Sequence, residues 1–166
     1  MESAVQQSCF DCRLRPDRVF CDLPSETLQA FDAVKKIIQY PRNEKLFEEG
    51  HPARGIFVLC EGRAKLSVCS ETGKRLTLRI ATPGEVLGLS ASLSGAAYEV
   101  TAETLDDAKV ALVRRKDLLK FLRSHSEACI QVVYLLSQDL HTAYERVRSI
   151  GLTRHRHSSA SRARVS

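Results

Sequence analysis

Between residues 126 and 150 the apolar and small residues recur at alternating steps of four and three residues. This 3.5-residue period keeps one stripe of a helix facing a second helix over several turns. The stripe of an ordinary surface helix drifts off such a repeat by about 20° per heptad. The pattern therefore predicts a dimerisation helix over residues 126–150. Beginning near Cys129, the predicted interface comprises Val133, Leu136, Leu140, Ala143, Val147 and Ile150.

The same helix has a second set of apolar residues, which leaves an alternative open. Ile130, Val132, Leu135 and Tyr144 could pack on the body of the same chain. In that case the segment is a single amphipathic helix rather than half of a dimer.

Upstream, from Lys45 to Val113, the period of the pattern is two, which is typical of β-strands. Residues 55–61, 64–69 and 76–80 alternate, and Glu71-Thr72-Gly73-Lys74 predicts a tight hairpin turn between the last two. Further short strands are expected at 98–102 and 109–113. Glycines punctuate the whole region at short intervals, which favours a small barrel or jelly roll.

Segments whose apolar residues recur at helical intervals flank this β region on both sides. Leu28, Phe31, Val34 and Ile38 predict a helix that begins near Ser25, with Ser25 as a candidate cap, and ends before Pro41. Residues 115–124 predict a second short helix. We therefore expect a mainly β fold with flanking helices (α+β). Its parts are an N-terminal arm (1–22), a β-roll (23–125), the dimerisation helix (126–150) and a basic tail (151–166).

Composition adds three constraints. A hydrophobic content of 43% and a charged content of 27% are ordinary for a globular domain, and we find neither a secretory signal nor a membrane span. A cytoplasmic protein is therefore expected, whose six cysteines are free thiols or metal ligands. Four of the five net positive charges lie in the tail, at Arg154, Arg156, Arg162 and Arg164, so the folded part offers no evident basic face for nucleic acid. The tail is expected to be disordered.

Four sequence blocks in this order resemble the sensor domain of the Crp/Fnr family of bacterial transcription regulators. They are Leu46-Phe47-Glu48-Glu49-Gly50, residues 55–62, Pro83-Gly84-Glu85-Val86-Leu87-Gly88 and residues 100–104, and the resemblance covers about residues 9–152. It implies a cyclic-nucleotide-binding-type β-roll or jelly roll, a homodimer and a winged helix-turn-helix after the long helix. The sixteen residues after Ile150 are too few and too polar for that last domain.

Expectations for partners follow from this resemblance. We expect a homodimer that binds DNA only through a missing C-terminal domain, and that could form heterodimers with a full-length relative. No membrane partner is expected. The sequence contains no set of residues typical of a nucleophilic or phosphate-binding enzyme site, so an enzyme is not expected.

The resemblance also implies a nucleotide pocket, in which relatives use a Glu for the ribose and an Arg-Ser pair for the phosphate. Here the ribose position is Leu89 and the phosphate pair falls near Ala96-Ala97; the dimer-helix positions that offer hydroxyls to the base look like Val147 and Arg148. Leucine and alanine can neither bind a hydroxyl nor neutralise a phosphate. The candidate pocket is degenerate, and a cyclic nucleotide is not expected as its ligand. Its residues are Gly84, Glu85, Gly88, Leu89, Ala96 and Ala97.

The N-terminal arm carries a candidate metal site at Cys9, Cys12 and Cys21. Thiolates two residues apart can bind one soft metal or one edge of a cluster. The oxygen-sensing branch of the Crp/Fnr family holds an iron–sulfur cluster in this arm, with a fourth cysteine whose matching position here is Val110. The open alternatives are a cluster, a zinc site or thiol switch, and free thiols.

We therefore expect a sensor and dimerisation domain that signals through its dimer helix, with an iron–sulfur or thiol-based redox sensor as the alternative.

Overall fold

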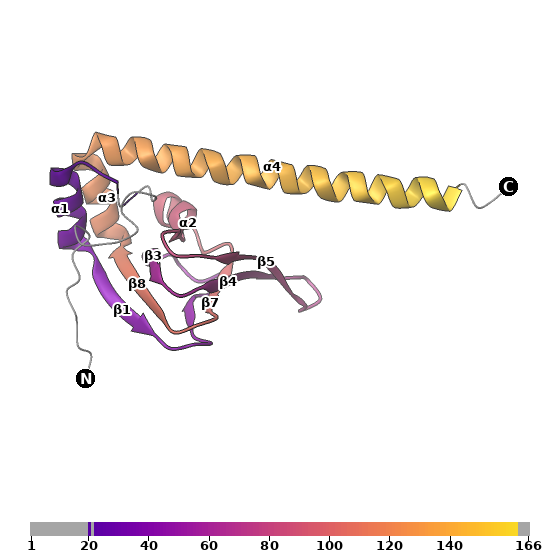
Figure 1. Ribbon diagram of the computed structural model, residues 1–166, viewed down its shortest axis with the longest axis horizontal. Helices are drawn as coiled ribbons and strands as arrows, with labels where there is room; N and C mark the ends of the chain where they lie inside the picture. Colours follow the sequence, from indigo (N-terminus) through magenta and orange to yellow (C-terminus); the bar gives the residue numbers. More distant parts are fainter. Residues whose placement is uncertain (1–19, 21, 163–166) are drawn as a thin grey trace. The chain divides into compact units, whose positions relative to one another are not determined.

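The computed structural model describes residue 20 and residues 22–162, with side chains described up to residue 151. The chain consists of two compact units, residues 1–129 and 130–166. The first unit contains all the strands among the described residues, and the second includes the greater part of the long helix (Figure 1). Cys9, Cys12 and Cys21 lie outside the described residues.

Two four-stranded antiparallel sheets form the body of the first unit (Figure 1). In one sheet the order is β1 (Lys36–Tyr40), β8 (Ala108–Arg114), β3 (Gly55–Glu61) and β6 (Val86–Leu87). In the other it is β2 (Lys45–Phe47), β7 (Thr101–Thr104), β4 (Ala64–Cys69) and β5 (Arg75–Ala81). This architecture confirms the predicted β-roll and the hairpin of β4 and β5.

Aromatic and aliphatic side chains fill the core of the roll. The rings of Phe47 and Phe57 lie 5.3 Å apart, and Tyr98 stacks on Phe47 at 4.2 Å. Residues 55–59 of β3 are buried on both faces of the strand, although their sequence only predicted alternation. A strand that is covered on both sides loses the polar half of the pattern, because both faces exclude water.

Three helices of the first unit flank the roll: α1 (Ser25–Val34), α2 (Leu89–Ser94) and α3 (Arg115–Ser124). Phe31 of α1 contacts Phe121 of α3 edge-on at 5.7 Å, and Phe20 lies against Phe31 at 5.3 Å. The bounds of α3 are those predicted. The six-residue helix α2 was not predicted, because it is too short to show a helical period.

The prediction for the N-terminal helix was right about its start at Ser25 but wrong about its cap and its C-terminal end. The helix ends at Val34, and Ile38 lies in β1, where it pairs with Val110 of β8. Two adjacent β-branched residues suit a strand, and the sheet pairing overrides the helical spacing. Ser25 makes no capping hydrogen bond, since Pro24 occupies the N-cap position.

Two further boundaries differ from the sequence prediction. The strand expected at 98–102 is β7 at Thr101–Thr104, and Tyr98 lies in the loop before it. The long helix α4 runs from Ser126 to Arg162, so it does not end at Ile150, and residues 151–162 are helical rather than disordered. That segment contains no proline to stop the helix, and one glycine costs a helix only about 1 kcal/mol. None of the helices in the described residues is long and apolar enough to cross a membrane.

Candidate ligand pocket and pairing helix

The turn that opens the candidate pocket is fastened to the roll by its backbone. Gly84 N–H donates to the Leu59 carbonyl, and Leu59 N–H donates back to the Glu85 carbonyl at 3.0 Å. The Glu85 carboxylate accepts hydrogen bonds from the Arg79 guanidinium and from the backbone and hydroxyl of Thr82. Glu85 is therefore engaged in holding the turn together.

Helix α2 follows directly and carries the position of the ribose-binding residue. Gly88 precedes the helix in the left-handed conformation, with a φ of 77°, and Leu89 is the buried first residue of α2. A Cβ atom at residue 88 would lie 2.8 Å from the Tyr98 ring, so only glycine fits there. The leucine side chain offers no hydrogen bond to a ribose hydroxyl.

The loop after α2 carries the positions of the phosphate-binding pair. Ala96 and Ala97 are both exposed, and they face residues 52–53 through a backbone hydrogen bond and an isolated bridge. The Arg115 guanidinium lies against Gly95 and donates from Nε to the Ser92 carbonyl at 2.8 Å. This cation binds a carbonyl near the C-terminal end of α2, where a positive charge interacts favourably with the helix dipole.

Taken together, the pocket residues do not fit a cyclic nucleotide. The carboxylate of the turn is engaged by Arg79, the ribose position is a buried leucine and the phosphate positions are alanines. Two buried hydroxyls, those of Ser67 and Ser92, have no hydrogen-bond partner among the described residues.

Tyr98 was missed as a site residue by the sequence reasoning. Its hydroxyl donates to the Gly55 carbonyl at 2.7 Å and accepts from the backbone N–H groups of Arg54 and Gly55. Around it lies an open hollow of about 390 Å³, lined by Phe47, Glu48, His51, Pro52, Arg54 and Tyr98. Glu48 accepts from Lys45 at this rim, and that hydrogen bond lowers the pKa of the Glu48 carboxyl. The glycine-bounded helix from Gly88 to Gly95 was the sequence signal that could have located this loop.

The first turn of α4 is anchored in the first unit. The Thr27 hydroxyl of α1 donates to the Glu127 carboxylate, which lowers the pKa of Glu127. A negative charge at this position also favours the N-terminus of the helix. The Cys129 thiol donates to the Leu122 carbonyl at 3.0 Å, so Cys129, the first residue of the predicted stripe, is already partnered.

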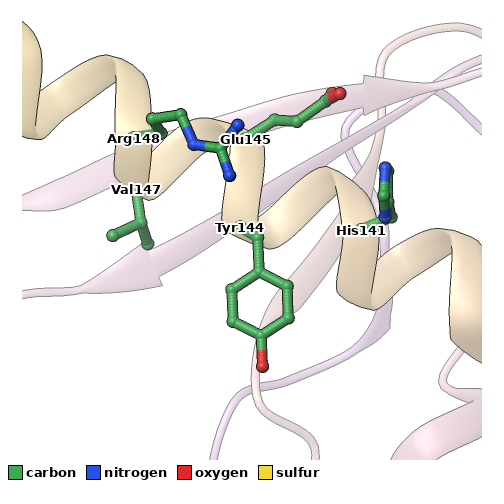
Figure 2. Close-up of a pocket in the computed structure, with 5 residues that line it drawn as sticks. All are labelled: His141, Tyr144, Glu145, Val147 and Arg148. Atoms are coloured by element: carbon green, nitrogen blue, oxygen red, sulfur yellow. The ribbon is translucent and has the colours of Figure 1, made fainter.

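Along the helix, the predicted interface residues lie on an uncovered surface. Leu136 is half-buried, whereas Val133, Leu140, Ala143, Val147 and Ile150 are exposed, as is every residue from 137 to 151. The second apolar set of the helix is only partly covered. Val132 is buried and Leu135 is half-buried, but Ile130 and Tyr144 are exposed. A hollow of about 350 Å³ on this helix is lined by five residues, which Figure 2 shows as sticks: His141, Tyr144, Glu145, Val147 and Arg148.

The cysteines that the structure describes do not complete a metal site with one another. Cys69 is exposed, Cys60 and Cys129 are half-buried, and Val110, the position of the fourth cysteine in the oxygen-sensing branch, is fully buried in β8. Among the described residues there is no group of three or more histidine, cysteine or acidic side chains that could hold a metal ion.

The antiparallel β-roll with its short helix between two glycines, followed by a long helix, defines a cyclic-nucleotide-binding fold. The model of the cyclic nucleotide-binding domain family matches residues 37–125, which is just over half of the chain. The chain belongs to this family, and its homologues are transcription regulators of the Crp/Fnr type.

Curated relatives are similar over most of this chain. The transcriptional activatory protein AadR of Rhodopseudomonas palustris is 23% identical over 84% of the chain and 57% of its own length. The transcriptional activator protein Anr of Pseudomonas aeruginosa is 25% identical over 81% of the chain and 55% of its own length. The chain thus spans little more than half the length of these relatives.

Solved structures share the fold. The catabolite activator protein of Thermus thermophilus superposes with a TM-score of 0.73 at 20% identity, over 80% of this chain and 62% of that chain. The sensor domain of the transcriptional regulator DNR from Pseudomonas aeruginosa superposes with a TM-score of 0.66 at 19% identity, over 80% of this chain and 89% of that chain.

Proposed function

We propose that this chain is the sensor and dimerisation part of a transcription regulator, and that it signals through the pairing of α4 with α4 of a second copy. The observation that carries the proposal is the apolar stripe of α4, which has a heptad period and is exposed in the single chain. Exposed rows of large aliphatic side chains mark interaction surfaces, because leaving them in water is unfavourable. The interface comprises Val133, Leu136, Leu140, Ala143, Val147 and Ile150.

The Leu140→Lys variant tests this pairing. Leu140 lies near the middle of the stripe, so the substitution places two lysines face to face and should raise the dissociation constant of the dimer at least about a hundredfold. Thr142→Lys is the matched control, since Thr142 is exposed on the same helix but lies off the stripe. Analytical ultracentrifugation should show a monomer for Leu140→Lys and a dimer for Thr142→Lys. A Leu140→Lys protein that remains dimeric would disprove the assigned interface.

The effector is not expected to be cyclic AMP. Leu89, Ala96 and Ala97 replace the groups that would bind the ribose and the phosphate, and a phosphate without a cation is costly to bury. A calorimetric titration with cyclic AMP or cyclic GMP should show no heat of binding up to millimolar ligand. Saturable micromolar binding would contradict this part of the proposal.

The output of this part is indirect, because residues 1–150 carry only one of the five net positive charges and offer no evident basic face for specific DNA contacts. We expect no sequence-specific DNA binding by this chain alone, and mixed dimers with a full-length relative are its route to a regulated promoter. Co-expression of two differently tagged proteins, this chain and such a relative, tests the mixed dimer by tandem purification. Recovery of the two separate homodimers alone would count against it.

A second candidate function rests on the cysteine spacing of the arm. Cys9, Cys12 and Cys21 would bind an iron–sulfur cluster or act as thiol sensors, and a cluster would supply oxygen- or redox-dependent chemistry there. Iron and acid-labile sulfide are measured on protein purified without oxygen, together with the visible spectrum. The cluster should be lost in Cys12→Ala but kept in the control Cys69→Ala. Colourless, iron-free wild-type protein would remove the cluster and leave only the thiol sensor.

A further inference from the structure

The hollow beside Tyr98 shares no residue with the candidate nucleotide pocket, and the function proposed above does not use it. We call it the Tyr98 hollow. Its volume is about 390 Å³, and small-molecule sites commonly measure roughly 300–1,000 Å³. Its lining combines apolar surface from Phe47, Pro52 and Tyr98 with three polar residues, Glu48, His51 and Arg54.

Backbone hydrogen bonds between two loops hold the walls of the Tyr98 hollow in place. Gly50 N–H donates to the Tyr98 carbonyl at 2.9 Å, and Tyr98 N–H donates to the His51 carbonyl at 3.0 Å. Beside them, Pro52 lies opposite Ala97 in an isolated bridge. A site whose walls are already fixed loses less conformational entropy when a ligand binds.

The Tyr98 hydroxyl is fully engaged by the chain itself. It donates to the Gly55 carbonyl at 2.7 Å, and it accepts from the backbone N–H groups of Arg54 and Gly55 at 3.0 and 3.2 Å. A hydroxyl has one hydrogen to donate and two lone pairs to accept with. Tyr98 therefore offers a ligand only the surface of its ring, and recognition of a polar group is left to the charged residues.

Among these charged residues, Arg54 is the one that is available to a ligand. Glu48 accepts a hydrogen bond from Lys45 at 2.7 Å, and the Nε2 atom of His51 lies 3.9 Å from the second oxygen of the same carboxylate. The Arg54 side chain is exposed, and it forms neither a hydrogen bond nor an ion pair within the described part of the chain. With His51 neutral, the charges of Lys45 and Glu48 cancel, so Arg54 leaves the hollow positively charged.

We infer that the Tyr98 hollow binds a small organic monoanion, a carboxylate attached to a flat apolar ring, and that Arg54 binds the carboxylate. A guanidinium matches a carboxylate with two parallel N–H···O hydrogen bonds. A flat ring suits the remaining lining, because aromatic rings pack well edge-on or offset against one another. The inference goes beyond the proposed function and does not depend on the pairing of α4, since every lining residue belongs to the first unit.

Benzoate is the probe that tests the site, titrated into ¹⁵N-labelled protein and followed by amide NMR shifts. Saturable shifts are expected at the amides of residues 53–55 and 98. The dissociation constant should be about 0.1–1 mM, because water in the open hollow screens the charge. Shifts confined to other residues, or no saturation by about 10 mM benzoate, would overturn the inference.

Benzamide tests whether charge is recognised. It has the same ring without the negative charge, so it should bind at least about tenfold more weakly than benzoate, because hydrogen bonds to an ionised group are the stronger ones. Equal dissociation constants for benzoate and benzamide would contradict the assigned ligand class.

The Arg54→Gln variant tests the residue. Loss of its cation should weaken benzoate binding about tenfold. Arg123→Gln is the matched control, because Arg123 is equally exposed but lies on α3 and does not line the hollow. Its dissociation constant should stay within about twofold of the wild-type value. Equal affinities of the two variants would overturn the role of Arg54, and if Arg54→Gln failed to fold, the comparison of benzoate with benzamide would still decide.

The Leu140→Lys variant separates this inference from the proposed function. Monomers of that variant should bind benzoate with the wild-type dissociation constant, because the hollow lies within one chain. If Leu140→Lys stays dimeric while benzoate binds, the helix pairing is wrong and the site stands. If it gives monomers and benzoate binds to neither protein, the pairing stands and only the site fails.

Discussion

The β-roll and the long helix handle apolar surface in opposite ways. In the roll, Phe47, Phe57 and Tyr98 are buried, with Tyr98 stacked on Phe47 and Phe57 tilted against Phe47, and the Tyr98 hydroxyl makes three hydrogen bonds. Along α4, Leu140 and Val147 are equally apolar but lie more than half exposed. The core of the roll is thus covered within one chain, whereas we propose that a second chain covers the apolar stripe of the helix.

This difference predicts how stability depends on protein concentration. Phe57→Ala should lower the free energy of unfolding by about 3–5 kcal/mol at any concentration, since it leaves a cavity in the core of the roll. Val147→Ala should cost less than about 0.5 kcal/mol in dilute protein but more at high concentration, where dimerisation adds to stability. Urea unfolding at two protein concentrations separates the two behaviours. If the stability lost in Val147→Ala did not depend on protein concentration, the predicted difference between the roll and the helix would be wrong.

Within the roll, the glycines of the pocket loop offer a smaller and sharper comparison. Gly88→Ala should destabilise the roll by about 2 kcal/mol or more, because φ is positive and the new Cβ would meet the Tyr98 ring at 2.8 Å. Gly73→Ala has nearly the same φ, but nothing lies within 4 Å, so only about 1 kcal/mol of backbone strain is expected. Thermal unfolding measures both. Equal losses would show that Tyr98 does not constrain the turn.

The smallest predicted effect concerns an exposed ion pair of the roll. Arg63 donates two hydrogen bonds to Asp106, which lowers the pKa of the Asp106 carboxyl below its ordinary value of 3.8. The lowered pKa means that the pair stabilises the fold above about pH 4, and that this contribution disappears as the pH falls further. Arg63→Gln should therefore flatten the loss of stability on acidification below pH 4, whereas Lys116→Gln should not. Acid titrations followed by circular dichroism would reveal the difference, and identical profiles would contradict it.

The sequence predicted the parts of the fold whose pattern is set locally. The bounds of α3 and the hairpin of β4 and β5 follow from periodicity and from one glycine turn. Ile38 was assigned to a helix because its partner, Val110, lies 72 residues further along the chain and is brought beside it only by the sheet. Pairing at that sequence distance leaves no local signal.

The candidate site was predictable to a similar extent. The residue types alone predict that Leu89, Ala96 and Ala97 cannot supply the side-chain contacts to ribose and phosphate that relatives make. The roles of Glu85 and Arg115 could not be predicted, because each depends on a partner supplied by the folded chain, Arg79 in one case and the Ser92 carbonyl in the other.

We propose that a second copy covers the apolar stripe of α4. Sedimentation equilibrium of the unaltered protein, over a hundredfold range of concentration, tests it most directly. A dimer should give a mass of twice 18.5 kDa that falls toward 18.5 kDa only on strong dilution. A mass of 18.5 kDa throughout the range would contradict it.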